Sequence, residues 1–138
     1  MLKNTIATIV GFIVAATVVY IIETLLGHAL FPLPEHIDPN DLSSIKANLH
    51  LIPIGAKLFV ILAHFSGIIA GMLIAGLISK TSMIPAYIVG GLLVLATIGT
   101  IIMLPKALWF AACDGLLAIA AFYFGKSLAS RHVYGVLV

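Results

Sequence analysis

The stretch IGAKLFVILAHFSGIIAGMLIAGLI, residues 54–78, decides the fold of this chain. A helix needs about 20 apolar residues to cross a bilayer core about 30 Å thick, and this stretch is long enough. Its only ionisable side chains are those of Lys57 and His64. Small residues recur at every fourth position and form a face that a second helix can approach closely: Ala63, Gly67, Gly71 and Ala75. The stretch predicts a transmembrane helix with one close-packing face.

Three further apolar runs fill most of the remaining chain, at residues 5–31, 84–104 and 107–128. Of the 138 residues, 62% are hydrophobic and 9% are charged, whereas a soluble domain has roughly 25% charged residues. Short turns join the last three runs, so consecutive helices should be antiparallel neighbours. The sequence predicts an all-α membrane protein with a single domain, residues 1–138, folded as an antiparallel up-down four-helix transmembrane bundle.

The first run is longer than the core of a secretory signal peptide, which spans about 7–15 residues, so we expect it to be retained as a span. It carries a second small-residue face, formed by Ala7, Gly11 and Ala15. We predict that such faces pack helices within one chain. Self-association of two copies through these faces is the alternative.

The polar connection between the first two spans covers residues 32–53. Asp38 before Pro39 is a typical helix start, and Asp41 would then lie in the first turn, near the positive end of the helix dipole. Three apolar residues of this segment would share one face of the helix: Leu42, Ile45 and Leu49. The pattern predicts a short amphipathic helix on the membrane surface.

Cationic residues are slightly more numerous on one side of the predicted bundle. The side that holds both termini carries Lys3, Lys80, Lys126 and Arg131. The side of the polar connection carries Lys46, Lys57 and Lys106, together with acidic residues. The positive-inside rule therefore predicts that both termini are cytoplasmic.

Glu23, His64 and Asp114 lie inside the predicted spans, where an unpaired charge costs several kcal/mol. At about 1.5 Å per residue, each lies roughly 10–12 Å from one end of its span. Because the spans alternate in direction, these three residues should occupy one layer on the side of the polar connection. Lys57 projects from the same helix face as His64, and His28 lies nearer to water than Glu23. We predict a polar pocket lined by these side chains and covered by the surface helix.

Several functions fit such a layer. It could relay protons, since an imidazole titrates near neutral pH. Glu23, His64 and Asp114 are also acceptable ligands for zinc or iron, although they lack the local spacing of a metal motif. They could instead serve a metal-dependent or lipid-modifying intramembrane enzyme, or simply supply hydrogen bonds between helices. The sequence contains no recognisable nucleophile or phosphate-binding motif, and it predicts no particular cofactor.

The segment from Glu23 to Pro34, ETLLGHALFPLP, and the segment from Leu104 to Phe110, LPKALWF, resemble those of small four-span bacterial inner-membrane proteins without an assigned activity. The resemblance implies a bundle in a bacterial cytoplasmic membrane and carries over no catalytic residue.

From these patterns we expect a largely non-enzymatic protein that handles a proton or a small solute, or that acts as a membrane-embedded binding or scaffold module. Its surroundings are the lipid bilayer, and an acyl chain is one conceivable ligand. A net charge of +2 with scattered lysines excludes a nucleic-acid interface.

Overall fold

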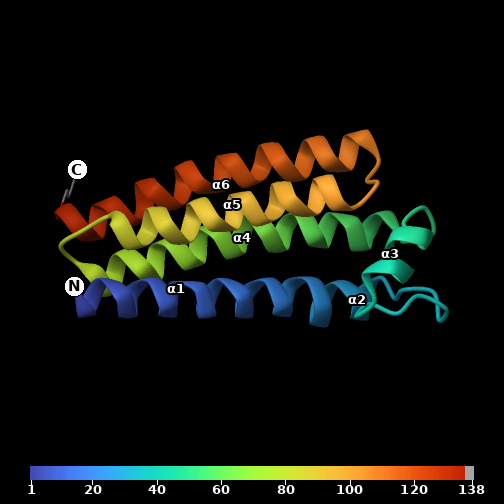
Figure 1. Cartoon of the computed structure of the whole chain (residues 1–138), viewed down its shortest axis with the longest axis horizontal. Helices are drawn as coiled ribbons and strands as arrows, with labels where there is room; N and C mark the ends of the chain where they lie inside the picture. Colours follow the sequence, from blue (N-terminus) through green and yellow to red (C-terminus); the bar gives the residue numbers. More distant parts are fainter. Residues whose placement is uncertain (136–138) are drawn as a thin grey trace.

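The computed structural model describes residues 1–135, and every regular element in that range is a helix. Four helical segments are long and apolar enough to cross a membrane: Leu2–Leu30, Ile54–Ser79, Ile84–Met103 and Leu108–Tyr134. Figure 1 shows them side by side, with successive segments joined at alternating ends. The start of the first segment and the end of the last lie at the same end of the molecule (Figure 1). The prediction of an all-helical protein with four membrane-spanning helices is confirmed.

The first segment is continuous but not uniform. It consists of α1 (Leu2–Tyr20), the π-helix η1 (Ile21–Gly27) and α2 (His28–Leu30). The remaining segments are α4 (Ile54–Ser79), α5 (Ile84–Met103) and α6 (Leu108–Tyr134). The short helix α3 (Leu42–Asn48) lies in the connection between α2 and α4. We call the end of the bundle that carries α3 the loop end, and the opposite end the terminus end (Figure 1).

Helix α4 is central, because it packs against α1, α5 and α6, whereas α1 and α6 make no contact with each other within residues 1–135. The seam between α1 and α4 is built from the predicted small residues. A Cβ atom added at Gly71 would lie 2.8 Å from the Cβ of Ala15 and 2.9 Å from the carbonyl oxygen of Gly11. Ala63 and Ala75 are fully buried. The small-residue faces of the first two spans thus pack two helices of the same chain.

A hydrophobic core fills the half of the bundle nearer the terminus end. Its members come from α4, α5 and α6 and from the turn before α5, and they include Ile68, Met72, Met83, Val89, Ala121 and Ala129. At that end the Ser79 hydroxyl donates a hydrogen bond of 2.9 Å to the side-chain carbonyl of Asn4, which joins α4 to α1. The outer faces of the helices carry many exposed leucine and isoleucine side chains, as expected for surfaces that face lipid.

The surface helix begins later than predicted. The Asp38 carboxylate accepts a hydrogen bond of 2.8 Å from the Asn40 amide, which closes a turn before the helix. Asp41 is the N-cap of α3 and accepts hydrogen bonds from the Ser43 hydroxyl at 2.6 Å and from the Ser43 amide at 2.9 Å. These two bonds hold the pKa of the Asp41 carboxyl below its usual value. The prediction that the helix starts at Asp38 is therefore wrong, because the Asp38 side chain stabilises a turn instead.

Helix α6 continues to Tyr134, beyond the predicted end of the fourth span at residue 128. Hydropathy falls where the chain reaches water, but helical hydrogen bonding does not require an apolar sequence. Arg131 and His132 lie in the last turn, where positive charge is favourable at the helix C-terminus. The helix ends at Gly135, which has a φ of 64° and so adopts the left-handed conformation typical of a helix stop.

We predict that Gly71→Ala destabilises the protein, because the new methyl group would collide with backbone and side-chain atoms of α1. The expected loss is about 1–3 kcal/mol, typical of overpacking. Gly99→Ala is the matched control, because a Cβ atom there has no neighbour within 4 Å. Thermal unfolding in detergent measures both variants. Equal melting temperatures of the two variants would show that close packing of α1 on α4 at Gly71 does not stabilise the protein.

Candidate functional site

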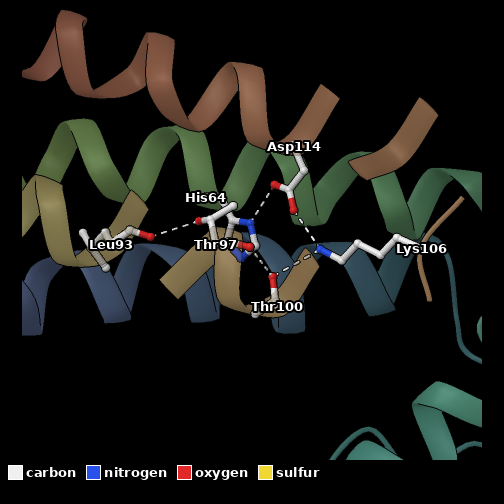
Figure 2. A network of polar contacts seen from close by, with 6 residues as sticks. All are labelled: His64, Leu93, Thr97, Thr100, Lys106 and Asp114. Carbon is white, nitrogen blue, oxygen red and sulfur yellow. Dashed lines mark hydrogen bonds and ion pairs between the residues drawn. The ribbon is translucent and has the colours of Figure 1, made fainter. Parts of the chain in front are cut away.

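The carboxylate of Asp114 is the most deeply buried ionisable group of the candidate site. It projects from α6, and its side chain is 0% exposed. Its Oδ1 atom lies 2.8 Å from Nδ1 of His64 on α4, and its Oδ2 atom lies 2.8 Å from Nζ of Lys106. Figure 2 shows the carboxylate between these two partners. One acidic side chain therefore links α4, α6 and the turn that precedes α6.

Lys106 reaches the carboxylate from the turn between α5 and α6, and its side chain is only 2% exposed. Its ammonium group also donates to Oγ1 of Thr100 at 3.3 Å and lies 4.6 Å from the ring centroid of Phe110. The Thr100 hydroxyl donates its own proton to the carbonyl of Thr97, so its lone pairs are free to accept from Lys106 (Figure 2). These contacts compensate for removing an ammonium group from water.

The two contacts of Asp114 indicate which ring nitrogen of His64 carries the proton. With the Lys106 ammonium group 2.8 Å from Oδ2, we infer that Asp114 is ionised, and an ionised carboxylate only accepts hydrogen bonds. Nδ1 of His64 must therefore carry the proton in its contact with Oδ1. In the neutral imidazole this leaves Nε2 as a hydrogen-bond acceptor and a base. The same carboxylate-to-imidazole arrangement orients histidines in many proton-transferring sites.

A cavity of about 490 Å³ lies at the loop end, in front of this cluster. Its wall includes five ionisable side chains, from η1, α2, α4 and the α5–α6 turn: Glu23, His28, Lys57, His64 and Lys106. The apolar part of the wall includes Ile45 and Leu49 of α3. The surface helix therefore forms part of the cover of the cavity, as the sequence suggests.

A second cavity of about 210 Å³ adjoins the first, because His64 and Thr100 line both. Its other lining residues come from α1, α4 and α5, and all but Thr97 are apolar: Ala16, Val19, Ile68, Leu93, Ala96 and Thr97. On each of these helices they lie nearer the terminus end than the residues of the first cavity. His64 thus lies where a cavity with charged residues in its wall meets an almost entirely apolar one.

The structure brings the predicted site residues together in part. His64 and Asp114 are in direct contact. Glu23, His28 and Lys57 share the first cavity with His64, but within residues 1–135 none of them forms an ion pair with either member of the His64–Asp114 contact. The structure thus shows a bonded pair, His64 and Asp114, and three further side chains in the wall of the cavity that His64 lines.

The geometry gives no support to a metal site built from Glu23, His64 and Asp114. In the described part of the chain no three histidine, cysteine, aspartate or glutamate side chains lie close enough to hold a metal ion. Both oxygen atoms of Asp114 already have protein partners. Metal coordination would have to displace Lys106 or His64 from the carboxylate.

Lys106 and Thr100 are the site residues that sequence reasoning missed. From the sequence, Lys106 belongs to a turn at the membrane surface, where a lysine is expected to be hydrated. The available signal is the spacing between Lys106 and Asp114, eight residues apart across Ala107, the N-cap of α6. The lysine side chain extends along the helix, and the Asp114 side chain points back toward the helix N-terminus, so the two can meet over this separation.

The chain is a membrane protein in which a lysine and a histidine, both in contact with one buried carboxylate, line a cavity at one end of the bundle. Comparison with protein-family models, with curated proteins and with solved structures gave no match to this chain. What the site can do is therefore inferred from its chemistry.

We predict that Asp114→Asn and Lys106→Met each lower the free energy of unfolding by about 3–5 kcal/mol, because each leaves its buried partner unpaired. The double variant should lose clearly less than the sum of the two. Chemical unfolding in detergent micelles measures this cycle.

Lys57→Met is the matched control for the cycle, because Lys57 lines the same cavity without an ion pair in residues 1–135. Its expected cost is within about 1 kcal/mol. Strictly additive losses in the cycle would show that Asp114 and Lys106 do not stabilise each other.

Proposed function

We propose that this protein is a binding module of the bacterial cytoplasmic membrane, which binds a small solute or a lipid in the loop-end cavity and exchanges a proton at His64. The observation that carries the proposal is that His64 lines a cavity of about 490 Å³ while the buried Asp114 fixes its ring. A neutral imidazole that donates from Nδ1 has Nε2 available to accept a proton. A cavity of this size matches those that enclose small organic molecules.

Cavity shape favours binding over conduction. A proton or ion path across the membrane needs polar groups or water along its whole length. On the terminus side of His64 the lining is almost entirely apolar, and beyond it lies the buried hydrophobic core. These features support a site that is closed toward the terminus end.

The proposed location has both termini in the cytoplasm and the loop end outside. Lys126 and Arg131 near the end of α6, together with Lys3 and Lys80, favour this orientation by the positive-inside rule. The start of α1 and the end of α6 lie at one end, which allows a single side for both termini (Figure 1). A solute would then enter from the periplasmic face, beside α3.

We expect a cysteine at position 60 to react with a water-soluble, membrane-impermeant thiol reagent, in a chain whose native Cys113 is replaced by alanine. Val60 lines the cavity, whereas Leu62 on the same helix is 48% exposed on the outer surface. The thiolate of the cysteine attacks the thiol reagent, and this thiolate forms in water and not in lipid. Val60→Cys should therefore react in right-side-out vesicles, and the matched variant Leu62→Cys should not.

Two results of this labelling experiment would count against the account. Equal reaction of Val60→Cys and Leu62→Cys, in vesicles of either orientation, would show that the cavity is no better hydrated than the outer surface and would end the binding proposal. Reaction of Val60→Cys only in inside-out vesicles would reverse the proposed orientation and leave the binding site in place.

A lipid-modifying enzyme is the second candidate function, and the contact between Asp114 and His64 favours it. A carboxylate that orients an imidazole is the arrangement by which many enzymes prepare a general base. Here Nε2 of His64 would remove a proton from water or from a hydroxyl group of a bound lipid.

The enzyme candidate predicts a change in lipid mass. The purified chain in lipid nanodiscs should convert a lipid to a product that mass spectrometry detects, and His64→Gln should abolish the conversion. His132→Gln is the matched control, because His132 is exposed near the end of α6. Lipids that stay unchanged in the presence of the wild-type chain would eliminate this candidate.

A further inference from the structure

Glu23 and Lys57 are opposite charges that line the same cavity without pairing. Glu23 comes from η1 and Lys57 from α4. The ion pairs within residues 1–135 are those of Asp114 with His64 and with Lys106, so neither Glu23 nor Lys57 takes part in one. Charged side chains on membrane helices are costly unless they are hydrated or compensated. A ligand that carries both signs of charge would compensate both at once.

The backbone around Glu23 departs from the regular helix. Residues Ile21–Gly27 are π-helical, and such widened turns occur frequently at functional sites. Gly27 permits close packing of this segment on α4, because a Cβ atom there would lie 3.0 Å from the Cβ of Phe59. The π-helix thereby holds Glu23 beside α4, the helix that carries Lys57 and His64.

The second cavity is mostly apolar and adjoins the first cavity on the side of the terminus end. We call it the slot. Ala16 on α1 and Ala96 on α5 line it and are exposed on the outer surface of the bundle. The slot therefore opens sideways between α1 and α5, toward the lipid. Its remaining wall is formed mainly by aliphatic side chains, including Val19, Ile68 and Leu93.

We propose that the ligand is a zwitterionic phospholipid, whose ammonium group is bound by Glu23, whose phosphate is bound by Lys57 and one of whose acyl chains lies in the slot between α1 and α5. This inference rests on the proposed function, because it assigns a ligand class to the same loop-end cavity. A head group near the membrane surface with a chain directed toward the membrane centre is also how a lipid lies in the bilayer. The charges on Glu23 and Lys57 match the two charges of such a head group.

Binding of single-chain lipids to the full chain in maltoside detergent tests this assignment by native mass spectrometry. The probes are lysophosphatidylethanolamine and lysophosphatidylglycerol of equal chain length, and phosphoethanolamine, which has the head group without the chain. Wild-type protein should bind the ethanolamine lipid about tenfold more tightly than the glycerol lipid, the usual scale for one charge-assisted hydrogen bond. Phosphoethanolamine should bind far more weakly than either.

Three variants separate the parts of the proposed site. Glu23→Gln should abolish the preference for ethanolamine while leaving the glycerol lipid unaffected. Lys57→Met should weaken both lipids, because both carry phosphate. Ala16→Phe should fill the slot and weaken both lipids without changing their ratio. The matched controls are Glu35→Gln, Lys46→Met and Ala112→Phe, which alter exposed residues outside both cavities.

The inference is overturned if wild-type protein binds the two lipids equally, if Glu23→Gln keeps the preference, or if none of the probes binds. It is also overturned if phosphoethanolamine binds as tightly as the lipid, since the chain would then contribute nothing. The labelling of Val60→Cys tests separately whether the cavity is hydrated. The proposed binding function therefore depends on that experiment and not on the lipid assignment.

Discussion

A carboxylate buried among membrane helices must have its charge compensated within the protein, and Asp114 meets this constraint through Lys106 and His64. The two contacts come from different parts of the chain, since His64 belongs to α4 and Lys106 to the turn before α6. They therefore fix the height of α6 relative to α4 at the loop end. Because Lys106 is held beside Thr100, they also fix the end of α5. The local geometry of three helices depends on one acidic side chain.

The two halves of the bundle are stabilised in different ways. Toward the terminus end, α4, α5 and α6 pack through an apolar core, and α1 meets α4 along Gly11, Ala15 and Gly71 with little space for a further methyl group. Toward the loop end the small residues give way to a π-helix and to polar side chains, and a cavity separates η1 from the cluster around Asp114. Close packing at one end and a polar network at the other leave room for a ligand without loss of the helical bundle.

Much of this architecture could be predicted from sequence because hydrophobic run length, short turns and small-residue spacing are local properties. The same reasoning placed His64 and Asp114 at a common depth, since only the count of residues from the ends of their spans was needed. The direction of a long, flexible side chain is not a local property of the sequence. Lys106 was therefore expected to be hydrated at the membrane surface, whereas its side chain is buried. The π-helix around Glu23 was also not predicted, because the prediction treats every span as a regular α-helix with a period of 3.6 residues. Asp38 can begin a helix or stabilise a turn before the helix, and these two structures differ by only a few hydrogen bonds. The position of the helix start could therefore not be decided from residue types.

The central claim is that an ionised Asp114 holds His64, a residue of the cavity wall, with its proton on Nδ1. Nitrogen-15 NMR of the histidine rings, in the full chain in lipid nanodiscs, tests it most directly, with the His64 signals assigned by their loss in His64→Gln. The account predicts a protonated Nδ1 in the wild-type chain at neutral pH and a changed Nδ1 signal in Asp114→Asn. An unprotonated Nδ1, or identical His64 signals in the two proteins, would contradict it.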